Sequence, residues 1–196
     1  MPRPLPLLGT PSPERRDAAR NREALLQAAT DLFACNDLRA VTMDAVAARA
    51  GVGKGTVFRR FGSREGLMAA LLDHAEAEWQ AAVLSGPPPL GPGAPPLERL
   101  LAFGESRMRT HLLQAALIAE AGRTWQANYA VLGFTSMHVR YLLGELGVEG
   151  DLPYLASALI APLSVPTLRQ QLDADGMSEQ RVLAGWQDLV RRVVGS

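Results

Sequence analysis

The sequence predicts an all-α protein built from two helical regions. Apolar residues recur at helical spacing from about residue 20 to residue 83, and residues 97–196 show no strand-like alternation of apolar and polar residues. Between these regions, residues 85–96 (SGPPPLGPGAPP) hold six prolines and three glycines, which a regular helix does not tolerate. We therefore expect an exposed connection there; the alternative is a polyproline ligand for another domain.

The composition is that of a globular protein. The chain has 196 residues, of which 47% are hydrophobic and 20% are charged, and its single cysteine, Cys35, excludes an internal disulfide. The sequence has no run of about 18 uncharged apolar residues, as a membrane span would need. Its first residues, MPRPLPLLGTPSP, lack the apolar core of a secretory signal. We expect a cytoplasmic protein without a membrane span.

The charge is unevenly distributed, although the net charge is zero. Residues 1–66 carry 11 Arg and Lys against 7 Asp and Glu, whereas the remaining residues carry 9 against 13. A basic N-terminal module on an acidic remainder is typical of a protein with one end that faces DNA.

Residues 1–19 are rich in proline and arginine and have no apolar periodicity, so we expect an N-terminal arm without regular structure. Arg15 and Arg16 of this arm, together with Arg20, suit contact with DNA phosphates. A solvated tail is the alternative interpretation of the same residues.

A first helix is expected from Asn21 to about Asn36, because Asn21 suits a cap position and the Asn36-Asp37 pair favours a turn. Apolar residues recur on one face of this helix and form a stripe for burial: Leu25, Leu26, Ala29, Leu32 and Phe33. The stripe should form the core on which the following helices rest.

Residues 42–61, TMDAVAARAGVGKGTVFRRF, have the outline of two short helices joined by a tight turn. Thr42 is a good N-cap, because its hydroxyl can accept a hydrogen bond from an amide of the first turn. Gly51 stands where a helix commonly ends in a left-handed residue, a conformation that glycine adopts cheaply. Gly53 can begin the second helix, although it offers no side-chain acceptor.

The second of these helices, Lys54–Phe61, should bury Val57 and Phe61, which are four residues apart and share a face. Its other face carries hydrogen-bond donors, positive charge and one gap: Lys54, Gly55, Thr56, Arg59 and Arg60. A short helix with an apolar back and a cationic front fits the major groove of DNA. The pattern indicates a helix-turn-helix; an ordinary helical hairpin with a solvated basic face is the alternative.

The stretch from Ala50 to Leu67, AGVGKGTVFRRFGSREGL, resembles the DNA-binding signature of the tetracycline-repressor (TetR) family of bacterial regulators. The family pattern is A-G-V-S-x-G-T-hydrophobic-Tyr-x-x-Phe, followed by x-S-K/R-E-x-L. The resemblance is strong from about residue 20 to residue 72 and architectural beyond. Gly53 stands for the usual Ser, and Phe58 for the usual Tyr. The second change removes the phenol that would form a hydrogen bond with a DNA phosphate. Apolar contact of Phe58 with a thymine methyl group remains possible. The matching positions are Gly51, Val52, Gly55, Thr56, Val57, Phe61, Ser63, Arg64, Glu65 and Leu67.

The pattern and the resemblance together imply a set of DNA-binding residues. Lys54, Arg59 and Arg60 are expected to contact bases and phosphates, and Gly55 to allow close approach. Arg64 matches a family position that holds a DNA phosphate. The full expected set is Thr42, Lys54, Gly55, Thr56, Phe58, Arg59, Arg60 and Arg64.

A fourth helix should begin at Ser63 and continue an apolar face to Val83, and residues 97–196 should be helical throughout. Asp151 and Ser178 are suitable N-caps. Gly147 and Gly176 are suitable stops. The expected helices are Leu97–Thr110, His111–Ala121, Thr124–Leu146, Leu152–Leu172 and Ser178–Val194.

Two stretches, Leu112–Ala119 and Leu155–Val165, are apolar nearly all round, which is typical of deeply buried helices or of helices between partners. Pro162 and Pro166 should kink the second stretch or line a packed interface. The TetR resemblance implies that the last two long helices pair with their symmetry mates in a homodimer.

The C-terminal helices also carry many apolar and aromatic residues, most of which should belong to the hydrophobic core. Ligand cavities are apolar with few polar anchors, so we expect some of these residues to line a ligand cavity. The candidate lining residues are Phe103, Met108, His111, Trp125, Tyr129 and Met137. Possible polar anchors are Arg107, His111, Gln126 and Asn128.

Enzymatic and metal-binding patterns are absent from the sequence. His74, His111 and His138 are scattered without a second ligand at helical spacing, so we expect surface or capping residues and no metal. No nucleophile motif, phosphate-binding glycine loop or dinucleotide fingerprint is evident. We expect neither an enzyme nor a bound cofactor.

The resulting hypothesis is a homodimeric transcriptional regulator, with repression as the default, that binds double-stranded operator DNA and responds to an unidentified small-molecule effector. Its expected parts are the arm at residues 1–19, a helix-turn-helix DNA-binding domain at residues 20–66, and a helical ligand-binding and dimerisation domain at residues 67–196. Two alternatives remain: a helical adaptor dimer with a vestigial DNA-binding head, and a helical enzyme.

Overall fold

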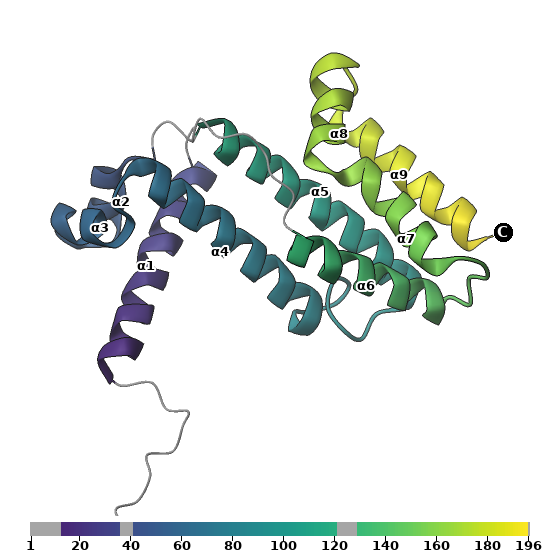
Figure 1. Cartoon of the computed structure of the whole chain (residues 1–196), viewed down its shortest axis with the longest axis horizontal. Coiled ribbons are helices and arrows are strands. Elements are labelled where there is room, and N and C mark those ends of the chain that lie inside the picture. Colours follow the sequence, from purple (N-terminus) through teal and green to yellow (C-terminus); the bar gives the residue numbers. More distant parts are fainter. Residues whose placement is uncertain (1–12, 36–40, 121–128, 196) are drawn as a thin grey trace, which may run out of the picture. The chain divides into compact units, whose positions relative to one another are not determined.

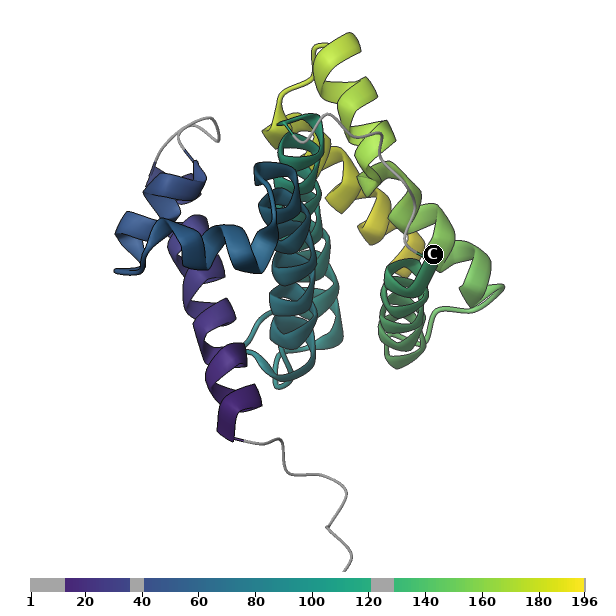
Figure 2. The ribbon, with the colours of Figure 1, turned by 60° about the vertical axis from the view of Figure 1, so that its left-hand side comes forward.

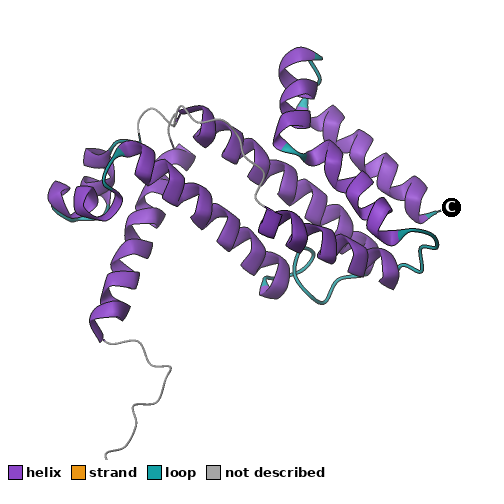
Figure 3. Cartoon of the chain, viewed as in Figure 1, coloured by secondary structure: helices purple, strands orange, loops and turns teal. Residues whose placement is uncertain are grey.

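The structure, a computed structural model, describes residues 13–35, 41–120 and 129–195. Within these ranges it contains nine α-helices and no strand (Figures 1 and 3), which confirms the all-α prediction. The chain divides into two compact units, residues 1–71 and residues 72–196. None of the described helices combines the length and the apolar character that crossing a membrane would require.

The first unit holds three helices and the start of a fourth. Helix α1 begins earlier than expected, so residues 13–19 are helical and do not belong to an irregular arm. Pro13 suits a first helical position because it needs no donor there, and Asp17 pairs with Arg20 one turn on. Residues 1–12 lie outside the described ranges. The helices are α1 (Pro13–Cys35), α2 (Met43–Arg49), α3 (Lys54–Phe61) and α4 (Arg64–Ser85).

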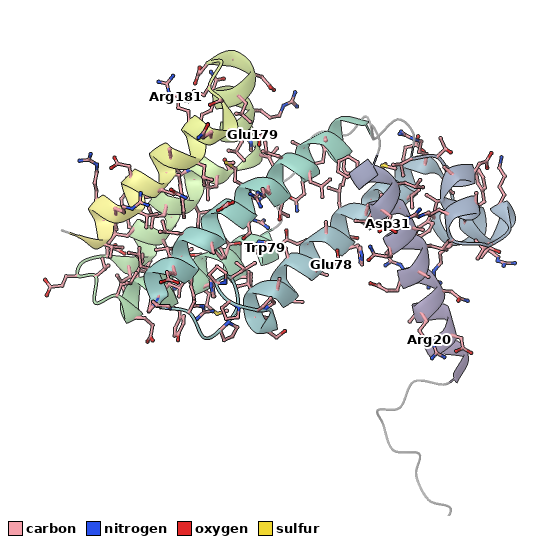
Figure 4. All side chains as sticks on the ribbon, turned by 180° about the vertical axis from the view of Figure 1, so that it is seen from behind. Arg20, Asp31, Glu78, Trp79, Glu179 and Arg181 are labelled. Atoms are coloured by element: carbon pink, nitrogen blue, oxygen red, sulfur yellow. The ribbon has the colours of Figure 1, made fainter. Side chains whose placement is uncertain are left out.

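The core of the first unit lies where α2 and α3 meet the apolar stripe of α1. Helix α1 contacts α2, and α2 contacts α3. Arg49 of α2 forms an ion pair with Asp31 of α1, in which Arg49 Nη2 lies 3.0 Å from Asp31 Oδ2 (Figure 4 labels Asp31). The residues most deeply buried in this unit are Leu26, Ala29, Val41, Val46, Val57, Leu67 and Met68.

The second unit packs the rest of α4 with the C-terminal helices (Figure 2). The two helices expected at residues 97–121 form the single helix α5, because no breaking residue interrupts them at His111. The Thr110 hydroxyl instead donates to the carbonyl of Ser106, 3.0 Å away and one turn back. These elements are α5 (Pro96–Glu120), α6 (Tyr129–Glu145), α7 (Leu152–Ile160), a 3-10 turn (Ala161–Leu163), α8 (Val165–Arg169), a π-helical turn (Gln170–Ala174) and α9 (Glu179–Val194).

The predicted N-caps of this unit and the predicted stop at Gly147 are confirmed. Asp151 accepts the amide of Tyr154 at 3.0 Å, and Ser178 accepts the amide of Arg181 at 3.2 Å. Gly147 has φ of +69° after α6, a left-handed conformation that suits glycine.

Pro162 and Pro166 interrupt the helix, as the sequence predicts. The segment expected at residues 152–172 is broken around them, so that α7 ends at Ile160 and α8 begins at Val165.

Trp186 of α9 lies at the centre of the second unit's core and is 4% exposed. Its indole Nε1 donates to the carbonyl of Leu159 on α7, 2.8 Å away. Its ring lies against Gly104 of α5, where a Cβ would be 2.0 Å from Cη2 of Trp186. The missing side chain at Gly104 therefore makes the space in which the indole joins α5, α7 and α9.

Candidate nucleic-acid interface

The helix pair α2–α3 is built by its end residues as the sequence predicts. The Thr42 hydroxyl accepts the amide of Ala45 at 3.1 Å and so caps α2. Gly51 has φ of +66° in the turn that follows. Gly53 begins α3 in extended conformation without a side-chain cap. Local sequence features therefore set the helix ends and the turn of this helix-turn-helix.

Helix α3 buries one side and exposes the other. Val57 is fully buried and Phe61 is half-buried. At 3.6 residues per turn, Gly55 and Arg59 lie on the side of α3 opposite these two. Both residues are exposed, so the centre of the free face of α3 is a glycine beside a guanidinium group.

Gly55 leaves a space that the fold itself does not use. None of the residues that the structure describes would lie within 4 Å of a Cβ built at this position, beyond its own stretch of helix. Glycine in a helix costs up to about 1 kcal/mol relative to alanine, so the fold alone would favour a larger residue. The space suits close approach of another molecule to the backbone of α3.

One flank of the free face is occupied by Lys54 and Phe58, which are one turn apart. Lys54 Nζ lies 2.8 Å from Asp44 Oδ2 of α2 and 5.6 Å from the centre of the Phe58 ring. Phe58 is 41% exposed. Asp44 thus neutralises Lys54 locally, and the sequence analysis did not identify this partner.

Arg64 stabilises the start of α2. Its Nε donates to the carbonyl of Val41 at 3.3 Å, directly before the Thr42 cap, and the side chain is half-buried. Ser63 caps α4 by accepting the amide of Gly66 at 3.1 Å, as predicted. The Ser63 hydroxyl also lowers the pKa of Glu65 by hydrogen bonding to its carboxylate.

The other flank opens into a hollow between α1 and α3, with a volume of about 300 Å³. We call it the α1–α3 hollow; its lining residues are Asn21, Arg22, Leu25, Thr56, Arg59 and Arg60. The sequence analysis placed the last three on the free face of α3 but missed Asn21 and Arg22 as part of a site. The signal that could have found them is their position on the same helical face as Leu25.

The candidate ligand residues of the second unit fall into separate places. Phe103, Met108 and His111 are buried on α5, with exposures of 1%, 3% and 7%. Met137 of α6 is 60% exposed and lines another hollow, of about 490 Å³, beside Tyr141. Trp125 lies outside the described residues, and so do the side chain of Tyr129 and the residues Gln126 and Asn128.

All three histidines are buried, which corrects the expectation of surface or capping positions. Each is 7% exposed. The His111 ring contacts the carbonyl of Leu163, and burial, then the charge of Arg107, lower its pKa to about 4. The His138 ring lies 5.1 Å from that of Phe103, and its pKa is lowered to about 4, chiefly by burial. The apolar faces of α5 and α6 carry these two rings inward. Because each ring has a pKa of about 4, both are neutral at pH 7.

Arg107 is held in a buried ion pair that the sequence analysis missed. Its Nη1 lies 2.7 Å from Oε2 of Glu76 on α4, and the two residues are 3% and 9% exposed. Its guanidinium carbon lies 4.3 Å from the centre of the Trp79 ring. Trp79 is on the side of α4 that faces α5 (Figure 4). Arg107 therefore joins two helices of the second unit.

Comparison with known proteins finds a family match within the first unit. Residues 25–71 match the model of "Bacterial regulatory proteins, tetR family". The HTH-type transcriptional repressor Rv3405c of Mycobacterium tuberculosis and the HTH-type transcriptional regulator Mb3439c of Mycobacterium bovis are each 46% identical to the chain over 68 residues. This match covers 33% of the chain and 36% of each relative, so the chain spans only about a third of the length of the curated relatives it matches.

Solved structures resemble the chain over most of its length. A transcriptional regulator of Rhodococcus sp. RHA1 has a TM-score of 0.57 at 17% identity and covers 89% of this chain and 96% of its own. A putative TetR-family regulator of Mesorhizobium loti has a TM-score of 0.57 at 20% identity, with coverages of 91% and 95%. The TetR-like regulator LfrR of Mycobacterium smegmatis, in complex with proflavine, has a TM-score of 0.50 at 20% identity, with coverages of 89% and 96%.

These similarities extend the family's fold over both units. The capped α2–α3 pair lies within residues 25–71, the part of the chain that is similar to the tetR family of bacterial regulatory proteins.

Proposed function

We propose that the protein is a homodimeric transcriptional repressor that binds a near-palindromic operator and is released by a small molecule. The observation that carries this proposal is the free face of α3, where exposed Arg59 and the open space at Gly55 lie opposite the buried Val57. Residues 20–66 would bind DNA, and residues 67–196 would bind the ligand and form the dimer.

The eight expected residues take different roles in this proposal. Arg59, at the centre of the face, would contact base edges in the major groove, and Gly55 would admit the DNA backbone or a base edge beside it. The hydroxyl groups of Thr42 and Thr56 would donate hydrogen bonds to phosphates. Lys54 and Phe58 would contact the opposite flank, Arg60 would contact phosphate, and Arg64 would position the start of α2.

Two such faces in a dimer would lie about 34–36 Å apart, one turn of DNA, and so would require a palindrome. The likeness of the whole chain to TetR-type folds supports the dimer, and the proflavine complex of LfrR supports a ligand of the second unit. A coupling of about 1–3 kcal/mol between ligand and DNA would lower operator affinity several-fold to a hundred-fold.

The test is selection of genomic fragments by the purified full chain, followed by a salt titration on the best fragment. We expect enrichment of one palindrome and a fall in affinity of about a thousandfold or more between low and physiological salt, since each neutralised phosphate releases counterions. Equal, weak binding to all fragments would contradict the proposal and would favour a helical adaptor with a vestigial head.

Replacing Gly55 with alanine should separate DNA binding from folding. Because the added methyl group meets open space, the stability of the first unit should rise by up to about 1 kcal/mol. Affinity for the selected fragment should nevertheless fall about tenfold or more, as expected when close approach is blocked. Thermal unfolding and fragment binding measure the two effects. The matched control is Gly53→Ala, one residue before α3, and equal affinity of the Gly55 variant and the wild type would refute the role of Gly55.

A further inference from the structure

The buried ion pair between α4 and α5 has a donor that its carboxylate does not use. Glu76 Oε2 accepts from Arg107 Nη1 at 2.7 Å and from Gln114 Nε2 at 2.9 Å. Its Oε1 accepts from Gln80 Nε2 at 3.0 Å. Arg107 Nε has no hydrogen-bond partner in the described part of the chain, although Arg107 is only 3% exposed. A buried donor without an acceptor costs free energy, so the guanidinium group has capacity for a further acceptor.

Positive charge exceeds negative charge around this ion pair. Burial, then the charge of Arg107, lowers the pKa of the His111 ring to about 4, and the opposite effect of Glu76 on that pKa is smaller. Burial, then the charge of Arg99, lowers the pKa of the His138 ring to about 4. Arg99 is half-buried, and its Nε is a second buried donor without a partner among the described residues. The electrostatic potential along this side of α5 is therefore positive, which favours an anion as ligand.

Aromatic rings lie beside the guanidinium group of Arg107. Its guanidinium carbon is 4.3 Å from the centre of the Trp79 ring. The centre of the Phe103 ring is 5.1 Å from that of Trp79, and the His138 ring stacks on Phe103 at the same distance. An anion that reaches Arg107 would therefore bring the rest of the ligand among stacked rings. Such surroundings favour a planar, aromatic ligand body.

Helix α4 is joined to α5 mainly by side chains. The backbone of α5 lies close to those of α6, α8 and α9, which is not the case to the same extent for α4. The link to α4 consists of the pair Arg107–Glu76, the contact of Arg107 with Trp79, and a hydrogen bond of 3.1 Å from Trp79 Nε1 to Ser106 Oγ. Loss of the ion pair would therefore remove a main attachment of α4, a helix that begins at Arg64 in the first unit.

We propose that the effector is an aromatic carboxylate and that Arg107 binds its carboxylate group in place of Glu76. This inference rests on the proposed release from DNA by a small molecule. The exchange keeps the buried guanidinium group paired, and a carboxylate suits the bidentate geometry of arginine. Glu76, once displaced, is exposed to water as α4 separates from α5. Because α4 continues into the first unit, the exchange at Arg107 would be coupled to DNA binding.

The experiment titrates 2-naphthoate and its neutral analogue 2-naphthamide into the full-length protein without DNA, with binding measured by calorimetry. The acid should bind about tenfold or more tightly than the amide, because only the acid forms a charge-assisted hydrogen bond with Arg107. Glu76→Gln removes the competing charge and keeps an acceptor of the same shape. This variant should bind the acid about tenfold more tightly than the wild type does, whereas a purely structural ion pair would give no such gain.

The variant Glu76→Leu with Arg107→Met removes both charges, so it leaves no unpaired charge in the core and tests the site even if Glu76→Gln does not fold. It should lose the preference for the acid. The matched control is Glu105→Leu with Arg109→Met, which removes a more exposed ion pair of 2.6 Å from α5 and should bind the acid as the wild type does. Equal affinity of the wild type for acid and amide would overturn the inference. Acid binding that persists after loss of Arg107 would overturn it as well.

A second measurement relates the site to DNA binding. Saturating 2-naphthoate should lower the affinity of the wild type for its selected fragment several-fold to a hundred-fold, and should have no effect on the variant without Glu76 and Arg107. An operator affinity that bound acid leaves unchanged would overturn the role of the acid as effector. Protein that binds its operator but not the acid would overturn this inference alone, whereas protein that binds the acid but no fragment would overturn the proposed function.

Discussion

Replacing Glu76 with alanine is expected to lower the free energy of unfolding of the second unit by about 3–5 kcal/mol, because it leaves a buried charge unpaired. Glu76 Oε2 accepts from Arg107 Nη1 at 2.7 Å and from Gln114 Nε2 at 2.9 Å, and its Oε1 accepts from Gln80 Nε2 at 3.0 Å. A single carboxylate therefore satisfies three donors from two helices.

The cost arises mainly from what remains after the substitution. Arg107 is 3% exposed, and its Nε already finds no hydrogen-bond partner in the described part of the chain. Burial lowers the pKa of Arg107, whereas the charge of Glu76 raises it. Without Glu76, the contact of the guanidinium that remains among the described residues is that with the Trp79 ring, and such a contact contributes about 2 kcal/mol when desolvated.

Urea unfolding followed by tryptophan fluorescence measures this effect, since Trp79, Trp125 and Trp186 all belong to the second unit. The control is Glu105→Ala, which breaks a more exposed ion pair of similar length, 2.6 Å, with Arg109 on α5, the helix of Arg107; it should cost less than about 1 kcal/mol. The double variant Glu76→Leu with Arg107→Met should recover most of the stability. A loss no larger than that of Glu105→Ala would refute the buried charge as the cause.

Replacing Gly104 with alanine should also destabilise the second unit strongly, although alanine favours a helix. The new Cβ would lie 2.0 Å from Cη2 and 2.1 Å from Cζ3 of Trp186. Trp186 is 4% exposed and is held by its hydrogen bond to Leu159, so the ring cannot swing out. Overpacking of this kind costs about 1–3 kcal/mol, and more where the backbone must move, against a helical gain of about 1 kcal/mol.

Unfolding midpoints of Gly104→Ala and of three further variants test this account. Gly133→Ala, on the exposed side of α6 with open space among the described neighbours, should be neutral or stabilising. Trp186→Phe removes the outer ring atoms, so the double variant Gly104→Ala with Trp186→Phe should be no less stable than Trp186→Phe alone. That non-additivity marks a direct contact. Additive losses would show that Gly104 is needed for a reason other than the indole.

The predictable parts of this fold depend on neighbours in sequence. Thr42 accepts an amide three residues on, and Gly51 ends α2 by its own conformation, so both follow from local rules. The start of α1 was missed because its first turns carry no apolar stripe. A polar pair there, Asp17 with Arg20, is not detected by a hydrophobic pattern.

The parts of the sites that escaped prediction depend on residues far apart in sequence. Glu76 and Arg107 are 31 residues apart, and Arg22 and Arg59 line the same hollow only because the fold brings α1 and α3 near one another. His138 is buried although nothing near it in sequence marks it as different from a surface histidine. Such pairs follow from packing between helices, which spacing along one helix does not specify.

The ion pair of Lys54 with Asp44 has a consequence for solution measurements of the proposed DNA binding. Asp44 acts as an internal counterion of the recognition helix, so a phosphate that takes Lys54 displaces a carboxylate in place of a dissolved cation. That exchange releases no salt. The number of phosphate contacts inferred from the salt dependence would therefore be one too low. The carboxylate of Asp44, which lies near the same phosphate, would also weaken binding to DNA in general. Tight binding would then require the additional contacts that only the correct operator provides.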